Sequence, residues 1–341
     1  MRAVVRSVRL LAGPLWLAGL LWLAPAPAPA QELAALEEGA RREGKLNLYG
    51  SMREDEATKV FEAFNRRYPF VKIDYFRGSE DRLTGRILAE ARAGTHNFDV
   101  LVTTTAYHLK GLDLAVRWQP PEAAAIRPEL RDPDGRLTPI YVNTNVIMYN
   151  TKLVPPAEAP KGYEDLADPK WKGKLCLEDT DYEWFHGLLE HMGRERMLAL
   201  FRRIAANQPS IRNGHGLLGD LVASGECPVA INNYGYQVGR GLKKGAPVDL
   251  VAVNPVITFA AAAAVSPKAP HPNAARLYVN WLVSEEGQKT LVGLGRFPVR
   301  SGLYPDPPRL LEGQQLKLQP PLEGEALRQA QALYRQVFQG R

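Results

Sequence analysis

Strand and helix patterns alternate over the first third of the chain, and this alternation constrains the fold more than any other feature of the sequence. Helical patterns over residues 54–68 and 83–93 separate three strand-like runs. The three runs are 45–49 (KLNLY), 71–76 (VKIDYF) and 99–102 (DVLV). Short links between alternating strands and helices predict a parallel sheet with helices on both faces.

A second α/β series follows, and two long extended segments, 140–149 (IYVNTNVIMY) and 248–259, flank it. Two α/β units joined by two extended crossovers predict an α/β fold of two lobes with a cleft between them. We expect residues 31–140 plus 255–300 in lobe 1 and 141–254 in lobe 2. Residues 301–341 form a C-terminal helical tail that the sequence assigns to neither lobe.

The first thirty residues have the pattern of a cleaved export signal. Arg2, Arg6 and Arg9 precede an apolar run over 10–23, and APAPAPA ends in the small residues of an A-x-A cleavage site. The run is short for a membrane span, and no cysteine lies near the cleavage site. We therefore expect cleavage between Ala30 and Gln31, which leaves a periplasmic protein without a lipid anchor. An uncleaved membrane anchor is the alternative.

The charge balance gives no reason to expect nucleic acid as a partner. The chain has 43 basic and 37 acidic residues, and three of the basic ones lie in the export signal, which leaves a net charge of +3. Beyond residue 30, no apolar run is long enough to span a membrane. The 311 residues that remain suffice for two medium domains or one large one.

Cys176 and Cys227 are the only cysteines, and each lies in a strand-like sequence, KLCLED and ECPVAIN. If these strands are parallel neighbours, both thiols lie near the strands' amino ends. An oxidising compartment favours a disulfide, whereas two buried free cysteines would pack as small apolar groups. The sequence leaves both interpretations open.

Six stretches between residues 45 and 290 carry a specific combination of motifs: LNLYGSMREDE, FDVLVTT, IYVNTNVIMYNTKLV, LADPKWKGKLCLEDTDYEWF, GECPVAINNYGYQVGR and PHPNAARLYVNWLVSEEGQ. In this combination the chain resembles the type II periplasmic solute-binding proteins of ABC importers, and among them the ferric-iron-binding group. The resemblance implies a two-lobed receptor that closes on a solute and delivers it to permease and ATPase subunits. We expect a monomer with no resident cofactor.

In the ferric-binding group, two adjacent tyrosines follow an Asn-Asn pair and bind Fe³⁺ as phenolates, together with a synergistic anion. Here Tyr234 follows such a pair, Gly235 occupies the second position, and Tyr236 comes one residue late. The resemblance therefore implies Tyr234 and Tyr236 as candidate metal ligands for iron as the transported cargo. The group's remaining ligand positions correspond to Arg53 and Thr104, which do not replace metal ligands well.

Position after a predicted strand, or at the start of a helix, gives the full set of candidate ligand-binding residues. They are Ser51, Arg53, Thr104, Asp181, Tyr182, Tyr234 and Tyr236. Because an arginine can clamp a carboxylate or phosphate, a small organic or phosphorylated anion is the alternative cargo.

Two nearby segments keep a structural interpretation beside a functional one. In the acidic segment 179–183, Thr180 and Glu183 have the spacing of a capping box. The segment 212–215 (RNGH) either contacts a ligand or forms a helix entry.

No catalytic motif is evident: G-x-S-x-G, H-E-x-x-H, the Walker loop and G-x-G-x-x-G are all missing from the sequence. We therefore expect a binding protein and not an enzyme. A hydrolytic metal site would have to be built from Asp179, Asp181, Glu183 and His186. A sensor or scaffold protein with the same two lobes is a third possibility.

Overall fold

The computed structural model describes residues 29–340, so that nearly all of the predicted export signal lies outside the described residues. It begins with α1 (Pro29–Glu43) and continues with the predicted alternation of strands and helices. The strands β1 (Lys45–Gly50), β2 (Lys72–Arg77) and β3 (Val100–Thr103) are parallel, in the order β2-β1-β3. The helices α2 (Glu54–Arg67) and α3 (Glu80–Arg92) connect them.

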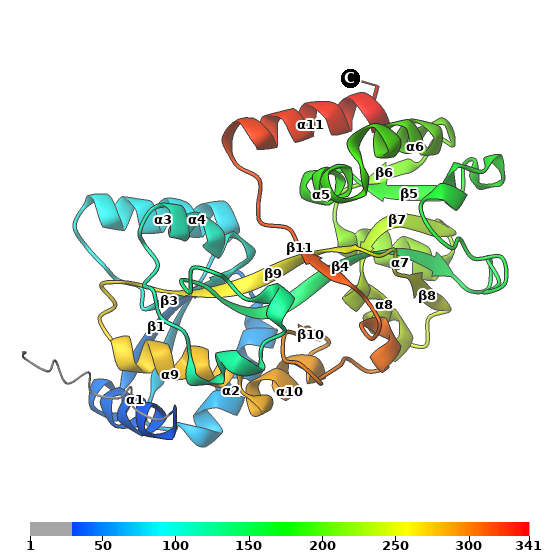
Figure 1. Ribbon diagram of the computed structural model, residues 1–341. Helices are drawn as coiled ribbons and strands as arrows, with labels where there is room; N and C mark the ends of the chain where they lie inside the picture. The colour runs from blue at the N-terminus through cyan, green and yellow to red at the C-terminus, as the bar shows by residue number, and fades with distance from the viewer. Residues whose placement is uncertain (1–28, 341) are drawn as a thin grey trace, which may run out of the picture.

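Two long strands carry the sheet from one lobe to the other (Figure 1). β4 (Thr138–Asn150) and β9 (Val256–Val265) pair antiparallel along most of their length, and β9 also pairs with β3. All thirteen residues of β4 are buried. The second extended segment differs from its prediction, because β8 (Val248–Val251) pairs with β4 as a separate strand and β9 runs on through the alanines after residue 259.

The second lobe extends the same sheet with three more strands. β7 (Val229–Tyr234) pairs antiparallel with β4 and parallel with β5 (Leu175–Glu178), and β6 (Ser210–Arg212) pairs with β5 at the edge. Three helices lie between these strands in the chain, α5 (Tyr182–Met192), α6 (Arg194–Ala206) and α7 (His215–Ser224), and α8 (Gly235–Lys243) follows β7. The two-lobed α/β fold that the sequence predicts is therefore present, while the exact lobe boundaries stay a prediction.

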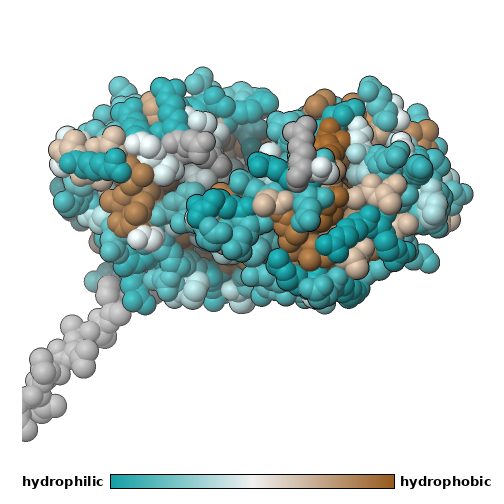
Figure 2. All heavy atoms as spheres, turned by 90° about the horizontal axis from the view of Figure 1, so that it is seen from above, coloured by the Kyte–Doolittle hydropathy of each residue, from teal (hydrophilic) through white to brown (hydrophobic). Residues whose placement is uncertain are grey.

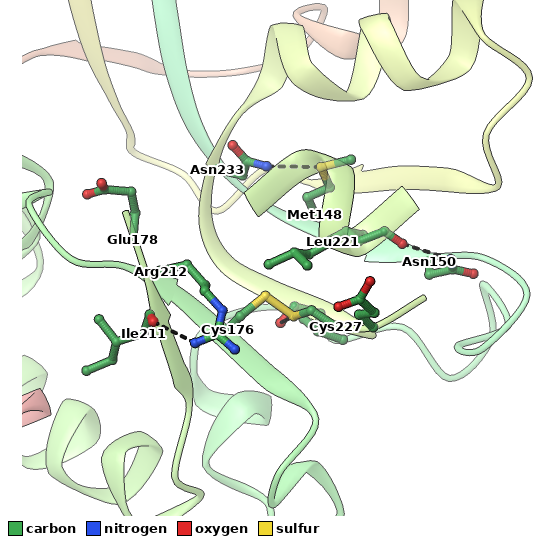
Figure 3. Close-up of a disulfide and its surroundings, with 12 residues drawn as sticks. Met148, Asn150, Cys176, Glu178, Ile211, Arg212, Leu221, Cys227 and Asn233 are labelled. Carbon is green, nitrogen blue, oxygen red and sulfur yellow. Dashed lines mark hydrogen bonds between the residues drawn. A yellow bond between two sulfur atoms is a disulfide. The ribbon is translucent and has the colours of Figure 1, made fainter. Parts of the chain in front are cut away.

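A disulfide joins Cys176 in β5 to Cys227 just before β7 (Figure 3). Their Cα atoms lie 6.1 Å apart. Because β5 and β7 are parallel neighbours with Cys176 opposite Ala230, both cysteines lie near the amino ends of the two strands. This arrangement resolves the alternative that the sequence left open in favour of the disulfide.

The elements not yet described belong to lobe 1, except for the C-terminal segment, which crosses to lobe 2. α4 (Tyr107–Gly111), α9 (Pro272–Val283), α10 (Glu285–Gly293) and β10 (Phe297–Pro298) belong to the first lobe and its edge. β11 (Leu316–Leu318) pairs parallel with β9, and α11 (Gly324–Phe338) packs on α5 and α6 (Figure 1). The tail that the sequence assigned to neither lobe thus ends on lobe 2.

Viewed from above, the molecule has two masses with a hollow between them, and hydrophilic side chains cover most of this face (Figure 2). None of the helices within the described residues has the length and apolarity that a membrane crossing requires.

Candidate functional site

A cavity of about 290 Å³ lies between the lobes, at the carboxyl ends of β3, β5 and β7. This is where ligands bind in open α/β sheets. Its walls come from both lobes, from the crossover strand β9 and from the C-terminal tail. The lining residues are Thr104, Thr105, Tyr107, Thr180, Asp181, Glu183, His215, Tyr234, Phe259, Ala260, Gln319 and Pro321.

Asp181, His215 and Tyr234 meet on the lobe 2 side of the cavity. The Nε2 atom of His215 lies 3.1 Å from Oδ1 of Asp181, and the two rings of His215 and Tyr234 stack with centroids 3.6 Å apart. Each of the three residues lies at the end of a helix or strand: Asp181 is the N-cap of α5, His215 begins α7, and Tyr234 ends β7. Burial alone would lower the pKa of His215, but the Asp181 carboxylate raises it above its ordinary value.

Glu178 lies behind this group and organises the loops that carry it. Its carboxylate accepts hydrogen bonds from the backbone N–H groups of Thr180 (2.6 Å) and Gly214 (3.0 Å). Asn232 links Glu178 to Asp181, because its side chain accepts from the Glu178 N–H and donates to Asp181 Oδ2. Burial raises the pKa of Glu178, and the negative charge of Asp181 adds to this effect.

Glu178, Asp181 and His215 each offer one atom that could bind a metal ion, and these three atoms lie within 4.8 Å of one another. The three residues are therefore a candidate cation-binding group. Asp181 and Glu183 put negative charge into the cavity, and its lining within the described residues includes no lysine or arginine. The pKa of Tyr234 is well above its ordinary value, because the phenol is buried and Asp181 lies nearby. The electrostatics of this cavity therefore favour a cation.

Of the seven candidate residues from the sequence, the cavity brings together Thr104, Asp181 and Tyr234. Arg53 is the N-cap of α2, has a side chain 64% exposed, and its guanidinium Nε donates to Asp55 over 3.0 Å. The Ser51 hydroxyl lies 3.3 Å from that of Thr103. Neither Ser51 nor Arg53 lines the cavity, so the arginine clamp on which the anion alternative depends is not part of this site.

The other two candidates also lie outside the lining of the cavity. Tyr182 packs edge-to-face on Tyr334, with ring centroids 5.4 Å apart. Tyr236 stacks behind Tyr234 at 5.9 Å, and the Arg296 guanidinium lies over its ring at 5.3 Å. Of the two candidate metal ligands, Tyr234 and Tyr236, it is therefore Tyr234 that lines the cavity.

Gly235, which replaces the second tyrosine of the ferric-binding pattern, has no space for a side chain. A Cβ atom here would lie 2.6 Å from Thr144 Oγ1 and 2.8 Å from Phe297 Cε2. Both neighbours are fully buried. The Tyr-Tyr pair is therefore incompatible with the packing of this chain around α8.

Two local patterns of the sequence, a capping box at Thr180 and a metal pair that the sequence did not favour at Glu183 and His186, are not realised in the described residues. Thr180 does not cap α5, because the N-cap is Asp181 and the Thr180 hydroxyl bonds to Glu178 instead. His186 forms no metal group with Glu183; its Nε2 atom lies 3.1 Å from Glu190 Oε1, one turn along the same helix.

The sequence did not decide whether His215 contacts a ligand or only begins a helix. It also gave no reason to select several other lining residues, among them Tyr107, Phe259 and Gln319. Glycine and asparagine before His215 were the only signal, and they fit a helix entry equally well.

Comparison with known proteins agrees with this architecture. Residues 109–319 match the family described as bacterial extracellular solute-binding protein. The chain belongs to this family. Its members bind solutes outside the cytoplasm, and the predicted role as a solute-binding protein is confirmed.

Individual relatives are similar over most of the chain. Iron uptake protein A1 of Synechocystis sp. is 27% identical over 289 residues, which cover 76% of this chain and 77% of the relative. The Fe(3+)-binding periplasmic protein of Serratia marcescens is 22% identical over 277 residues, with 77% and 81% covered. The structure of iron-bound HitA from Pseudomonas aeruginosa superposes with a TM-score of 0.71 and 26% identity over 86% of this chain and 99% of HitA.

Proposed function

We propose that this protein is the substrate-binding subunit of an ABC importer with a cationic cargo, and that this cargo is ferric iron. The observation that carries the proposal is the cavity between the lobes, where Asp181, Glu183 and Tyr234 meet without a lysine or arginine among the described lining residues. The relatives that bind iron support the identity of the cation.

Tyr234 and Asp181 would hold the ion. Hard Fe³⁺ prefers anionic oxygen donors, and a phenolate and a carboxylate are two of these. The surroundings keep the Tyr234 phenol protonated in the empty site, so binding would release its proton and would strengthen as pH rises. The cavity is much larger than one ion, which leaves space for an anion that completes the coordination shell. Tyr236 would join only after a rearrangement of the ring stack.

The role of His215 follows from its two contacts. Its ring supports one face of Tyr234 while its Nε2 atom pairs with Asp181. It therefore holds both oxygen donors on the same side of the cavity.

A small organic cation is a second candidate, because the rings of Tyr107, Tyr234 and Phe259 line the cavity beside the carboxylates. Aromatic faces and carboxylates together are the usual environment of ammonium groups. The lining gives no comparable support for an organic or phosphorylated anion, a hydrolytic centre or a sensor.

The test is the colour of the iron-loaded protein. Mature protein is stripped of metal and titrated with ferric nitrilotriacetate; a tyrosinate–iron site gives a visible charge-transfer band. We expect Tyr234→Phe to remove the band and the bound iron, whereas Tyr304→Phe, at a tyrosine outside the cavity, keeps both. A colourless wild type without bound iron would refute ferric iron as the cargo, and binding of an ammonium compound would then favour the second candidate.

We infer that the protein reaches the periplasm by its export signal and acts there with permease and ATPase subunits. The predicted cleavage between Ala30 and Gln31 would place the first mature residue in the first turn of α1. The mass of the protein recovered from the periplasm tests this boundary.

A further inference from the structure

The end of the C-terminal tail, residues 316–338, is called the tail from here on and forms one wall of the cavity. β11 pairs with β9 from Leu316 to Leu318, and the N–H of Gln319 donates to the Thr258 carbonyl over 2.9 Å. The tail then passes from the crossover strands to α11 on lobe 2 (Figure 1). Gln319 and Pro321 line the cavity on this path.

The side chain of Gln319 is fixed by close packing. It is only 5% exposed, and a Cβ atom on Gly187 of α5 would lie 2.9 Å from its Oε1 atom. Only glycine at position 187 therefore lets the amide of Gln319 lie this close to α5. Two residues further on, the Leu322 N–H donates to Glu183, a carboxylate of the cavity, over 3.5 Å.

Tyr334 connects α11 to the loop that carries Asp181. Its side chain is fully buried, and its hydroxyl donates to the backbone carbonyl of Glu178. Its ring packs edge-to-face on Tyr182 and on Phe185, with centroid distances of 5.4 Å in both cases. Tyr334 therefore contacts the chain on both sides of Asp181, at Glu178 before it and at Tyr182 after it.

We propose that this tail completes the cargo site: Gln319 and Pro321 contact the cargo, and Tyr334 is a positioning residue for Asp181. The match to the solute-binding family ends at residue 319, so most of the tail lies beyond the part that the family match covers. The proposal rests on the proposed function in taking the cavity as the binding site and, for the affinity measurements, in taking ferric iron as the cargo.

The experiment compares two tail variants with matched controls. Gln319→Ala removes the amide, and Gln336→Ala makes the same change at an exposed position of α11. Tyr334→Phe removes one hydroxyl, and Tyr304→Phe is its control. Affinity is measured with ferric nitrilotriacetate, folding by thermal unfolding, and the loop 178–182 by hydrogen–deuterium exchange.

We expect Gln319→Ala and Tyr334→Phe each to weaken iron binding about three- to tenfold, the range for loss of one hydrogen bond, with both controls unchanged. Gln319→Glu should tighten binding, because it adds a negative charge next to a cation. In Tyr334→Phe the amides of 178–182 should exchange faster, whereas those of β1 should not.

The outcomes separate the two proposals. Iron binding by the wild type with no change in any tail variant would overturn the role of the tail and leave the proposed function intact. No iron binding by the wild type would overturn the proposed function. The exchange measurement needs no cargo, so unchanged exchange in Tyr334→Phe overturns the role of the tail in either case.

Discussion

Gly235→Ala is predicted to destabilise the protein, although alanine favours helices more than glycine does. Gly235 is the first residue of α8, where the helix passes close to β4 and β10. The added Cβ would lie 2.6 Å from Thr144 Oγ1 and 2.8 Å from Phe297 Cε2, well inside van der Waals contact. Neither neighbour can move into solvent, because both are fully buried.

The magnitude follows from two opposing effects. Overpacking of a dense core costs about 1–3 kcal/mol, and two contacts below 3 Å place this site at the upper end. Replacement of a glycine within a helix by alanine stabilises the fold by about 0.5–1 kcal/mol, and by less at a helix end. The net loss in free energy of unfolding should therefore be about 2 kcal/mol. Gly235→Tyr, which restores the paired-tyrosine pattern, should lose more and gain no iron affinity.

Urea unfolding of Gly235→Ala, Gly85→Ala and the wild type tests this reasoning. Gly85 lies within α3, and a Cβ there would meet no atom within 4 Å. Gly85→Ala should therefore be slightly more stable than the wild type. A Gly235→Ala variant as stable as the wild type, at an unchanged m-value, would refute the steric argument and reopen position 235 to a second tyrosine.

Two further predictions concern lobe 2. Replacement of both Cys176 and Cys227 by serine should lower the free energy of unfolding by about 4 kcal/mol, as loop closure over 51 residues implies; a loss below about 1 kcal/mol in denaturant unfolding would contradict this estimate. The raised pKa of His215 means that its pairing with Asp181 stabilises the fold fully below about pH 6.5 and loses this effect as pH rises through the folded-state value. Unfolding at a series of pH values should show this decrease in the wild type and a smaller one in Asp181→Asn; equal decreases in both would contradict the pairing.

The fold could be predicted where the pattern is local. β1 to β3 and their helices follow the periodicity of their own residues, and parallel order follows from the short connections. α8 has no such signal, because three of its nine residues are glycine. The structure gives the reason for two of them: a Cβ on Gly235 or Gly241 would meet neighbours at 2.6 Å. Such packing constraints come from distant residues and leave no periodicity in the sequence.

The site could be predicted only in part, for a similar reason. Asp181 and Tyr234 follow strands and were found by position. Arg53 satisfies the same criterion, yet its neighbour Asp55 pairs with it at the surface. Gln319 follows none of the lobe 2 strands that the sequence predicts. It reaches the cavity only because β11, which precedes it, pairs with β9. Position along the chain identifies the edge of the sheet, but tertiary contacts decide which side chains line the cavity.

The link between Cys176 and Cys227 closes a covalent ring that contains part of the proposed site on lobe 2, although Tyr234 lies outside it. Glu178, Asp181 and His215 all lie within this ring, together with α5, α6 and α7. A single cut by a protease in one of its turns would therefore leave the chain in one piece. Such a nicked receptor would keep both its carboxylates and its imidazole attached to the rest of the site.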